Sequence, residues 1–150
     1  MKRFDYILIL LLFFVDQVTK YLVSSTLTFF DQITVIPQVL YFQLVHNYGA
    51  AFGIFQHQRF FLLVVGVLIV CLGYFFRSYF IKSIWSRYAM VFLFAGAFGN
   101  IIDRFRLGYV VDFIDIRILP VFNFADIFIN IAVICFIVEL VFYERYCNSK

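Results

Sequence analysis

The stretch AGAFGNIIDR, residues 95–104, closes a long apolar run with an asparagine, an aspartate and an arginine. The stretch FNFAD, residues 122–126, opens another apolar run and again places an aspartate three residues after an asparagine. Both runs have the length and character of membrane-spanning helices. An ionised carboxylate at hydrocarbon depth costs about 2.5–3.5 kcal/mol even on lenient insertion scales. Two acids in such places, Asp103 and Asp126, therefore indicate chemistry.

The composition of the chain is that of an integral membrane protein. Of its 150 residues, 65% are hydrophobic and only 14% are charged, and its mean hydropathy is +0.97. A soluble domain is about 45–50% apolar and about 25% charged. The net charge of +3 includes no basic cluster, so no nucleic-acid partner is expected. The three cysteines lack the spacing of a metal site or disulfide framework, and we expect them to be packing residues.

Four stretches approach the roughly 20 apolar residues that a transmembrane helix needs. They run from about Phe4 to Val23, Phe60 to Phe80, Tyr88 to Arg104 and Ala125 to Tyr143. The first starts with basic residues as a secretory signal peptide does, but no small-residue cleavage site follows, so a retained helix is expected. Because no repeat or linker interrupts the sequence, residues 1–150 are expected to form a single domain.

The distribution of Lys and Arg predicts the orientation in the membrane. With the N-terminus inside, seven basic residues lie at inner helix ends and five lie outside, and the inner loop from Arg77 to Arg87 has three basic residues and no acid. Both termini are therefore expected in the cytoplasm. Residues 24–59 and 105–122 then lie outside, and their β-branched and aromatic content predicts short strands that rest on the helix ends or the bilayer. The expected fold is an all-α membrane protein with four transmembrane helices and small extracytoplasmic β-strand elements.

The first span carries an acid and a base four residues apart, Asp16 and Lys20, in the order that stabilises a helix. Two interpretations of Lys20 stay open: it snorkels to the interface as an anchor, or it supports a site. Asp16 is too short to reach the interface. A role in fixing a site or binding a substrate headgroup is therefore plausible for Asp16.

The motif NYGAAFG, residues 47–53, closes the first outer segment. Gly49 and Gly53 permit backbone shapes that other residues resist, which suits a loop that approaches a ligand or helix closely. An ordinary turn before the second span would explain the motif as well. His46 is expected to be a polar loop residue, since no serine or cysteine nucleophile is recognisably paired with it.

Helical spacing in AGAFGNIIDR places Gly96, Asn100 and Asp103 on one face. Ala95 and Gly99 form the pattern of two small residues four apart that lets membrane helices pack closely. The following Arg104 can reach headgroups, a substrate carbonyl or an acid.

In the second stretch, Asn123, Asp126 and Asn130 are also expected to share a helix face. The third span runs outward and the fourth inward, so both acids lie at the outer end and can face each other. Two carboxylates held close share one proton, because both cannot ionise cheaply. One then takes a proton from water while the other polarises a carbonyl. The structural alternative is that Asp103 is only paired with Arg104 or Lys20.

Three further acids have other expected places. Asp112 is expected to bond to the site from behind, and Asp115 to be solvated. Glu139 lies 13 residues beyond Asp126. It should lie roughly 20 Å down the fourth helix, near the inner surface, and outside the site.

Three rival functions fit parts of the pattern. A proton-coupled transporter would use intramembrane acids, but these cluster at one side and no repeat is present. A metal-dependent enzyme acting on phosphates would hold Mg²⁺ with Asp103, Asp112 and Asp126, but no close D-x-x-D cluster exists. A membrane scaffold without catalytic activity leaves the two acids unexplained.

The motifs DQVTK, NYGAAFG, GAFGNIIDR, VVDFI and FNFAD occur in this order across the four spans. Together they closely resemble those of the bacterial lipoprotein signal peptidases (signal peptidase II), and the resemblance covers nearly the whole chain. Two departures stand in the fourth span: Ile127 replaces a small polar residue that often follows the second acid, and Ala132 replaces a common glycine. Both should affect helix packing more than the reaction.

The resemblance implies an aspartyl endopeptidase of the bacterial inner membrane, with its site near the periplasmic face. It would remove signal peptides from diacylglyceryl-modified prolipoproteins, cutting before the lipidated cysteine, and be sensitive to globomycin. Its partners would be these substrates and membrane lipids, and it would use no metal or other cofactor. A monomer is expected. The implied catalytic pair is Asp103 and Asp126. Residues that would bind substrate or support the site are Asp16, Lys20, Asn47, Gly49, Asn100, Arg104, Asp112 and Asn123.

Overall fold

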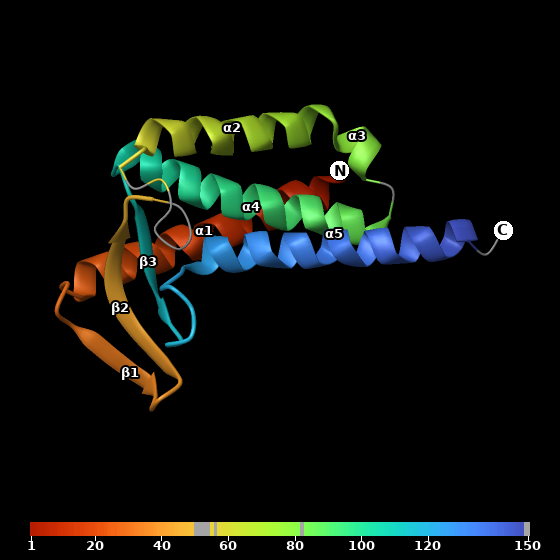
Figure 1. Cartoon of the computed structure of the whole chain (residues 1–150). Helices are drawn as coiled ribbons and strands as arrows, with labels where there is room; N and C mark the ends of the chain where they lie inside the picture. The colour runs from red at the N-terminus through yellow and green to blue at the C-terminus, as the bar shows by residue number, and fades with distance from the viewer. Residues whose placement is uncertain (50–54, 56, 82, 149–150) are drawn as a thin grey trace.

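The computed structural model describes residues 1–49, 55, 57–81 and 83–148, with side chains as far as Val141. Its elements in chain order are α1 (Arg3–Thr26), β1 (Gln32–Ile36), β2 (Leu40–Asn47), α2 (Arg59–Phe75), α3 (Arg77–Phe80), α4 (Ile84–Arg106), β3 (Val110–Asp115) and α5 (Phe124–Asn148). The long helices run side by side, and the strands gather at one end of the bundle (Figure 1). The chain termini lie toward the other end.

Three of the expected spans are confirmed as helices long and apolar enough to cross a membrane: α1, α4 and the part of α5 from Phe124 to Val141. The second expected span, Phe60–Phe80, is interrupted. Its helix α2 has 17 residues and ends where Phe76 takes a backbone conformation of φ −92° and ψ 10°, after which the short α3 follows. At about 1.5 Å per residue α2 is about 25 Å long, against a hydrocarbon core of about 30 Å.

Glycines let α4 pack closely against its neighbours. A Cβ atom on Gly96 would lie 2.4 Å from the carbonyl oxygen of Ala125 in α5, and one on Gly99 would lie 2.5 Å from Oδ2 of Asp16 in α1. The expected close helix contact is therefore confirmed at Gly99, and Gly96 makes a second one. Ala95, the other small residue of the expected pattern, is fully buried. The main apolar cluster, which includes Met90, Phe94 and Ala95 of α4, fills the bundle on the chain-terminus side of these glycines.

The three strands form an antiparallel sheet in the order β1-β2-β3. Every residue of β1 is exposed and every residue of β3 is buried, because β3 packs on the ends of α1 and α4. The predicted strands and their place at the helix ends are thus confirmed. The prediction that Asp115 is solvated is wrong: it is 5% exposed and accepts hydrogen bonds from Gln43 Nε2 and the Arg117 backbone N–H.

The opposite end of the bundle is fastened by polar contacts. Arg87 of α4 donates to both carboxylate oxygens of Asp5 in α1, at 2.8 and 3.0 Å from Nε. Ser83 caps α4 by accepting the N–H groups of Trp85 and Ser86, and its hydroxyl donates to Oε2 of Glu139 in α5. Glu139 therefore lies at this end, far from Asp126, as expected.

The close approach at Gly96 predicts that Gly96→Ala destabilises the protein by about 1–3 kcal/mol, the usual cost of overpacking, because the methyl group meets backbone that can yield only by moving α5. Gly66→Ala is the matched control: its Cβ would meet only the Ile101 side chain, at 3.0 Å. The melting temperature of each variant in detergent measures the difference. Equal melting temperatures for the two variants would contradict the argument.

Candidate functional site

The buried ammonium group of Lys20 is the centre of a polar network at the sheet end of the bundle. Its Nζ lies 2.9 Å from Asp16 Oδ2, 2.8 Å from Asp103 Oδ2 and 3.1 Å from Asn100 Oδ1. Lys20 is only 3% exposed. The snorkelling interpretation is therefore wrong, and this lysine uses all three N–H donors inside the protein.

Asp16 joins three helices. Its Oδ1 accepts the backbone N–H of Ala125, in the first turn of α5, at 2.8 Å. Its Oδ2 pairs with Lys20 and lies against Gly99 of α4. A carboxylate on α1 thus fixes the start of the helix that carries Asp126.

Asp103 is held by donors on both oxygens. Lys20 Nζ and the Val111 backbone N–H, at 3.3 Å, approach Oδ2, and Gln17 Nε2 donates to Oδ1 at 3.0 Å. Gln17 was missed by the sequence analysis. The clue was an amide side chain inside an apolar span, directly after Asp16, where an unpaired polar group is costly.

Asn100 connects Lys20 to Asp126. Its Oδ1 accepts from Lys20, and its Nδ2 donates to Asp126 Oδ1 at 2.8 Å. Asp103 and Asp126 therefore belong to one network. That their carboxylates face each other stays a prediction. In the part of the chain that the structure describes, they are joined through Lys20 and Asn100 and not by a hydrogen bond of their own.

The FNFAD motif is in part a helix cap. Asn123 Oδ1 accepts the N–H of Asp126 at 3.0 Å, and Asp126 Oδ2 accepts the N–H of Asn123 at 3.2 Å, so the two residues form a reciprocal capping pair at the start of α5. Asn123 precedes the helix. The expectation that Asn123, Asp126 and Asn130 share one helix face is therefore wrong for Asn123.

A third buried carboxylate, Asp112 of β3, stands behind this cap. Asn123 Nδ2 donates to its Oδ1 at 2.6 Å and Asn47 Nδ2 to its Oδ2 at 2.9 Å. Burial raises the pKa of Asp112 to about 7, and the nearby Asp126 charge adds to this effect, while the two asparagine donors oppose it. Asp112 thus bonds to the site from behind, as expected.

Arg104 and the Asn47 loop close one side of the network. Arg104 donates to the Gly49 carbonyl at 2.9 Å, and the Gly49 N–H donates to Asn47 Oδ1 at 2.9 Å. Gly49 therefore contributes backbone groups, while Gly53 lies outside the described residues. His46 is in β2 and not in a loop, with its ring stacked on Tyr109 at 3.8 Å.

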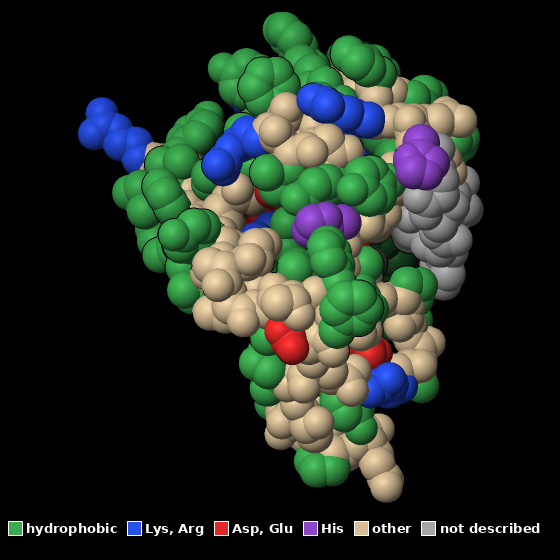
Figure 2. All heavy atoms as spheres, turned by 90° about the vertical axis from the view of Figure 1, so that its left-hand side faces the viewer, with side chains coloured by type: hydrophobic (Ala, Val, Ile, Leu, Met, Phe, Trp, Pro, Cys, Tyr) green, Lys and Arg blue, Asp and Glu red, His purple; other side chains and the backbone are tan. Residues whose placement is uncertain are grey.

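Charges in the network do not balance. Four carboxylates (Asp16, Asp103, Asp112 and Asp126) surround two cations (Lys20 and Arg104). Asp126 is half-buried, whereas the other three acids are at most 4% exposed. The face above this end carries many apolar side chains and few charged ones (Figure 2). Such a site offers one half-buried carboxylate, Asp126, beside fixed amide donors. Because four neighbouring acids cannot all ionise cheaply, the network can hold a proton.

Comparisons with known proteins identify relatives of this chain. A lipoprotein signal peptidase of Microcystis aeruginosa is 44% identical over 92% of this chain and 92% of its own length. One from Clostridioides difficile is 35% identical over 92% and 95%. A bacterial membrane enzyme solved by the in meso method at 2.3 Å resolution superposes with a TM-score of 0.88 at 36% identity, covering 97% of this chain and 91% of the other.

The family described as "Signal peptidase (SPase) II" matches residues 8–142. This match spans the network from Asp16 in α1 to Asp126 in α5, and the resemblance drawn from the sequence motifs is confirmed. The chain is therefore a member of the signal peptidase II family of aspartic endopeptidases.

Proposed function

We propose that this protein cleaves diacylglyceryl-modified prolipoproteins immediately before the lipidated cysteine, and that Asp103 and Asp126 activate the attacking water. Membership of the lipoprotein signal peptidase family supports the reaction class. The observation that carries the assignment of residues is the link from Asp103 through Lys20 and Asn100 to Asp126.

The proposed reaction is a hydrolysis that needs one proton held between two acids. The ionised aspartate removes a proton from water, whose oxygen then bonds to the scissile carbonyl carbon. The protonated aspartate donates a hydrogen bond to the carbonyl oxygen. When the carbon–nitrogen bond breaks, a proton passes to the amine. The products are a signal peptide with a new C-terminal carboxylate and a lipoprotein with a free N-terminal amine. Acid–base help of this kind gives about 10²–10⁴-fold in rate for each group.

The environments of the acids favour this function over its rivals. Asp103 does pair with Lys20, as the structural alternative holds, but that pairing does not explain the half-buried Asp126 with its two neutral donors. A shared Mg²⁺ would need free oxygens on Asp103, Asp112 and Asp126. Their oxygens instead face ammonium, amide and backbone donors, which a cation would have to displace.

The place of the network at the sheet end of the bundle supports the membrane arrangement that we propose. α2, extended by α3, would be a fourth span, and residues 1–150 would form a single domain in the inner membrane. Both termini would be cytoplasmic and the network would lie near the periplasmic face, where water and the lipidated cysteine can meet. We expect a monomer that is inhibited by globomycin.

Substitution tests the two acids directly. Asp103→Asn and Asp126→Asn are each expected to reduce cleavage of a purified diacylglyceryl-modified prolipoprotein by at least about 10²-fold, because an amide can neither accept nor share the proton. Cleavage by the native protein is expected to continue in EDTA.

The matched control is Asp115→Asn, at the far end of β3 from the network. It should leave the cleavage rate within about 2-fold, since the carboxylate of Asp115 accepts hydrogen bonds from Gln43 and Arg117, which are not members of the network. Full activity in either Asp103→Asn or Asp126→Asn would exclude the two-aspartate mechanism. Loss of activity in EDTA would favour the metal-dependent alternative.

The pKa of Asp112 gives a prediction about pH. Its rise from 3.8 to about 7 means that the folded protein keeps a proton that the unfolded chain has already lost between these two pH values. The contribution of Asp112 to stability therefore falls as pH rises from about 4 to 7 and is level above that, a loss of up to about 4 kcal/mol. In Asp112→Asn, the melting temperature in detergent should change less between pH 5 and pH 8 than it does in the native protein. An equal change in both proteins would contradict the assignment.

A further inference from the structure

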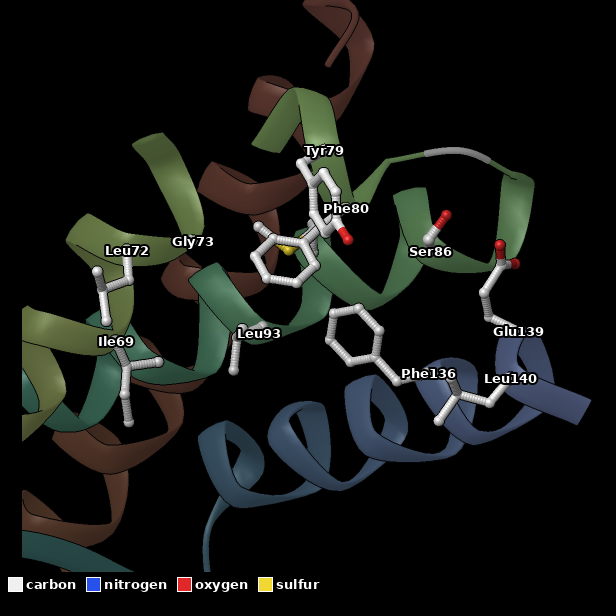
Figure 3. A pocket seen from close by; sticks show the side chains of 11 residues that line it. Ile69, Leu72, Gly73, Tyr79, Phe80, Ser86, Leu93, Phe136, Glu139 and Leu140 are labelled. Carbon is white, nitrogen blue, oxygen red and sulfur yellow. The ribbon is translucent and has the colours of Figure 1, made fainter. Parts of the chain in front are cut away.

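A cavity of about 680 Å³ lies at the end of the bundle opposite the site, between α2, α3, α4 and α5. Figure 3 shows its walls of apolar side chains, with Ile69 and Leu72 from α2 facing Phe136 and Leu140 from α5. The polar group of Glu139 stands at one end of this cavity, near the start of α4.

Two helix faces that line the cavity lead along α4 and α5 to the proposed active site. On α4, Ser86, Met90 and Leu93 line the cavity. Steps of three or four residues along the same helix face lead on to Ala97, Asn100 and Arg104. On α5, the same steps lead from Leu140 through Phe136, Val133 and Ile129 to Asp126. One face of each helix thus has the cavity at one end and the network at the other.

The strip between the cavity and the network has α4 as its floor and α2 and α5 on its two sides. α2 packs on one side of α4, where Gly66 meets Ile101 and Gly73 meets Phe94, and α5 packs on another side, where Gly96 meets Ala125. On the α5 wall, Val133 is 49% exposed and Leu140 is 62% exposed. We name the cavity together with this strip the α2–α5 groove.

The occupant is indicated by length and charge, and this step rests on the proposed function. A secretory signal peptide has a basic n-region followed by an apolar segment of about 7–15 residues before its cleavage site. Asp126 and Glu139 are 13 residues apart on α5. This separation is about 20 Å, the length of a similar helical segment in a substrate. An apolar groove with an acid at its far end complements an apolar helix with a basic end.

We propose that the α2–α5 groove seats the signal helix of the prolipoprotein and that Glu139 pairs with its basic n-region. The enzyme would then recognise its substrate at two points, the lipidated cysteine beside Asp126 and a cation about 20 Å away. Glu139 accepts a hydrogen bond from the neutral Ser83 hydroxyl, which leaves its negative charge uncompensated by that contact.

Charge exchange tests the pairing. Three diacylglyceryl-modified prolipoproteins that differ only in having Lys, Gln or Glu in the n-region are cleaved by each enzyme variant in detergent. Glu139→Gln, which keeps an acceptor for Ser83, is expected to reduce the kcat/KM ratio of the Lys substrate over the Gln substrate by about 3- to 5-fold, the range of a partly exposed ion pair. Glu139→Lys should reverse the preference in favour of the Glu substrate.

Ser83→Ala separates this role from helix capping. It removes the hydroxyl that Glu139 holds but keeps the carboxylate, so it should change cleavage of all three substrates alike. An unchanged substrate ratio in Glu139→Gln, or the same change of ratio in Ser83→Ala, would overturn the pairing. If the native protein cleaves none of the three substrates, the proposed function fails instead.

A bulky side chain tests the groove. Val133→Trp is expected to raise KM about 5-fold or more with little change in kcat, because the indole fills the path of the signal helix. Ile134→Trp is the control: Ile134 is 59% exposed and adjacent in sequence, but it points about 100° further round α5. Equal KM values for the two variants would show that the groove holds only membrane lipid, and would overturn the proposal.

Discussion

The buried ion cluster of Lys20, Asp16 and Asp103 is the interaction on which the rest of the structure depends. An ammonium group far from water costs several kcal/mol unless its partners are close and complete. Here two carboxylates and one amide oxygen, at 2.8 to 3.1 Å, satisfy all of its donors. Removing one partner would leave an uncompensated buried charge, which typically costs about 3–5 kcal/mol. The cluster therefore fixes α1 against α4 with a precision that apolar contacts between membrane helices do not supply.

The same cluster makes the glycines of α4 necessary. Asp16 can reach the Ala125 N–H only by passing close to α4, and Gly99 has no Cβ atom to obstruct its Oδ2. One helical turn away, Gly96 brings the Ala125 carbonyl against the helix backbone. Helix packing and site geometry are thus one constraint: the small residues that let α5 approach also place Asp126 beside Asn100.

The sequence predicted most of this arrangement because its strongest signals are local. Hydrophobic runs predicted the spans, β-branched residues predicted the strands, and polar residues inside apolar runs identified nearly every member of the network. The errors concern tertiary contacts. Lys20 and Asp115 were open to a solvated interpretation because nothing in the sequence reveals their distant partners. Those of Lys20 are Asn100 and Asp103 of α4, and Asp115 contacts Gln43 of β2. The break between α2 and α3 at Phe76 has no proline or glycine at that position to predict it. The role of Gln17 in the network was missed because its partners Gly99 and Asp103 are more than eighty residues away in the sequence.

Two neutral asparagines, Asn100 and Asn123, give the carboxylates of Asp103 and Asp126 different surroundings. Asn100 turns its side-chain oxygen toward Lys20, so its N–H donates to Asp126. Asn123 donates its side-chain N–H to Asp112, so its oxygen accepts a backbone N–H at the start of α5. Each amide orientation is imposed by a charge on its far side, and neither adds charge to the site. Asp103 consequently lies beside a cation and is buried. Asp126 is half-buried, and among the residues that the structure describes its hydrogen-bond donors are the neutral Asn100 side chain and the Asn123 backbone N–H. An acid and a base can therefore arise from one residue type, provided that the proton can pass between environments that the surrounding helices keep distinct.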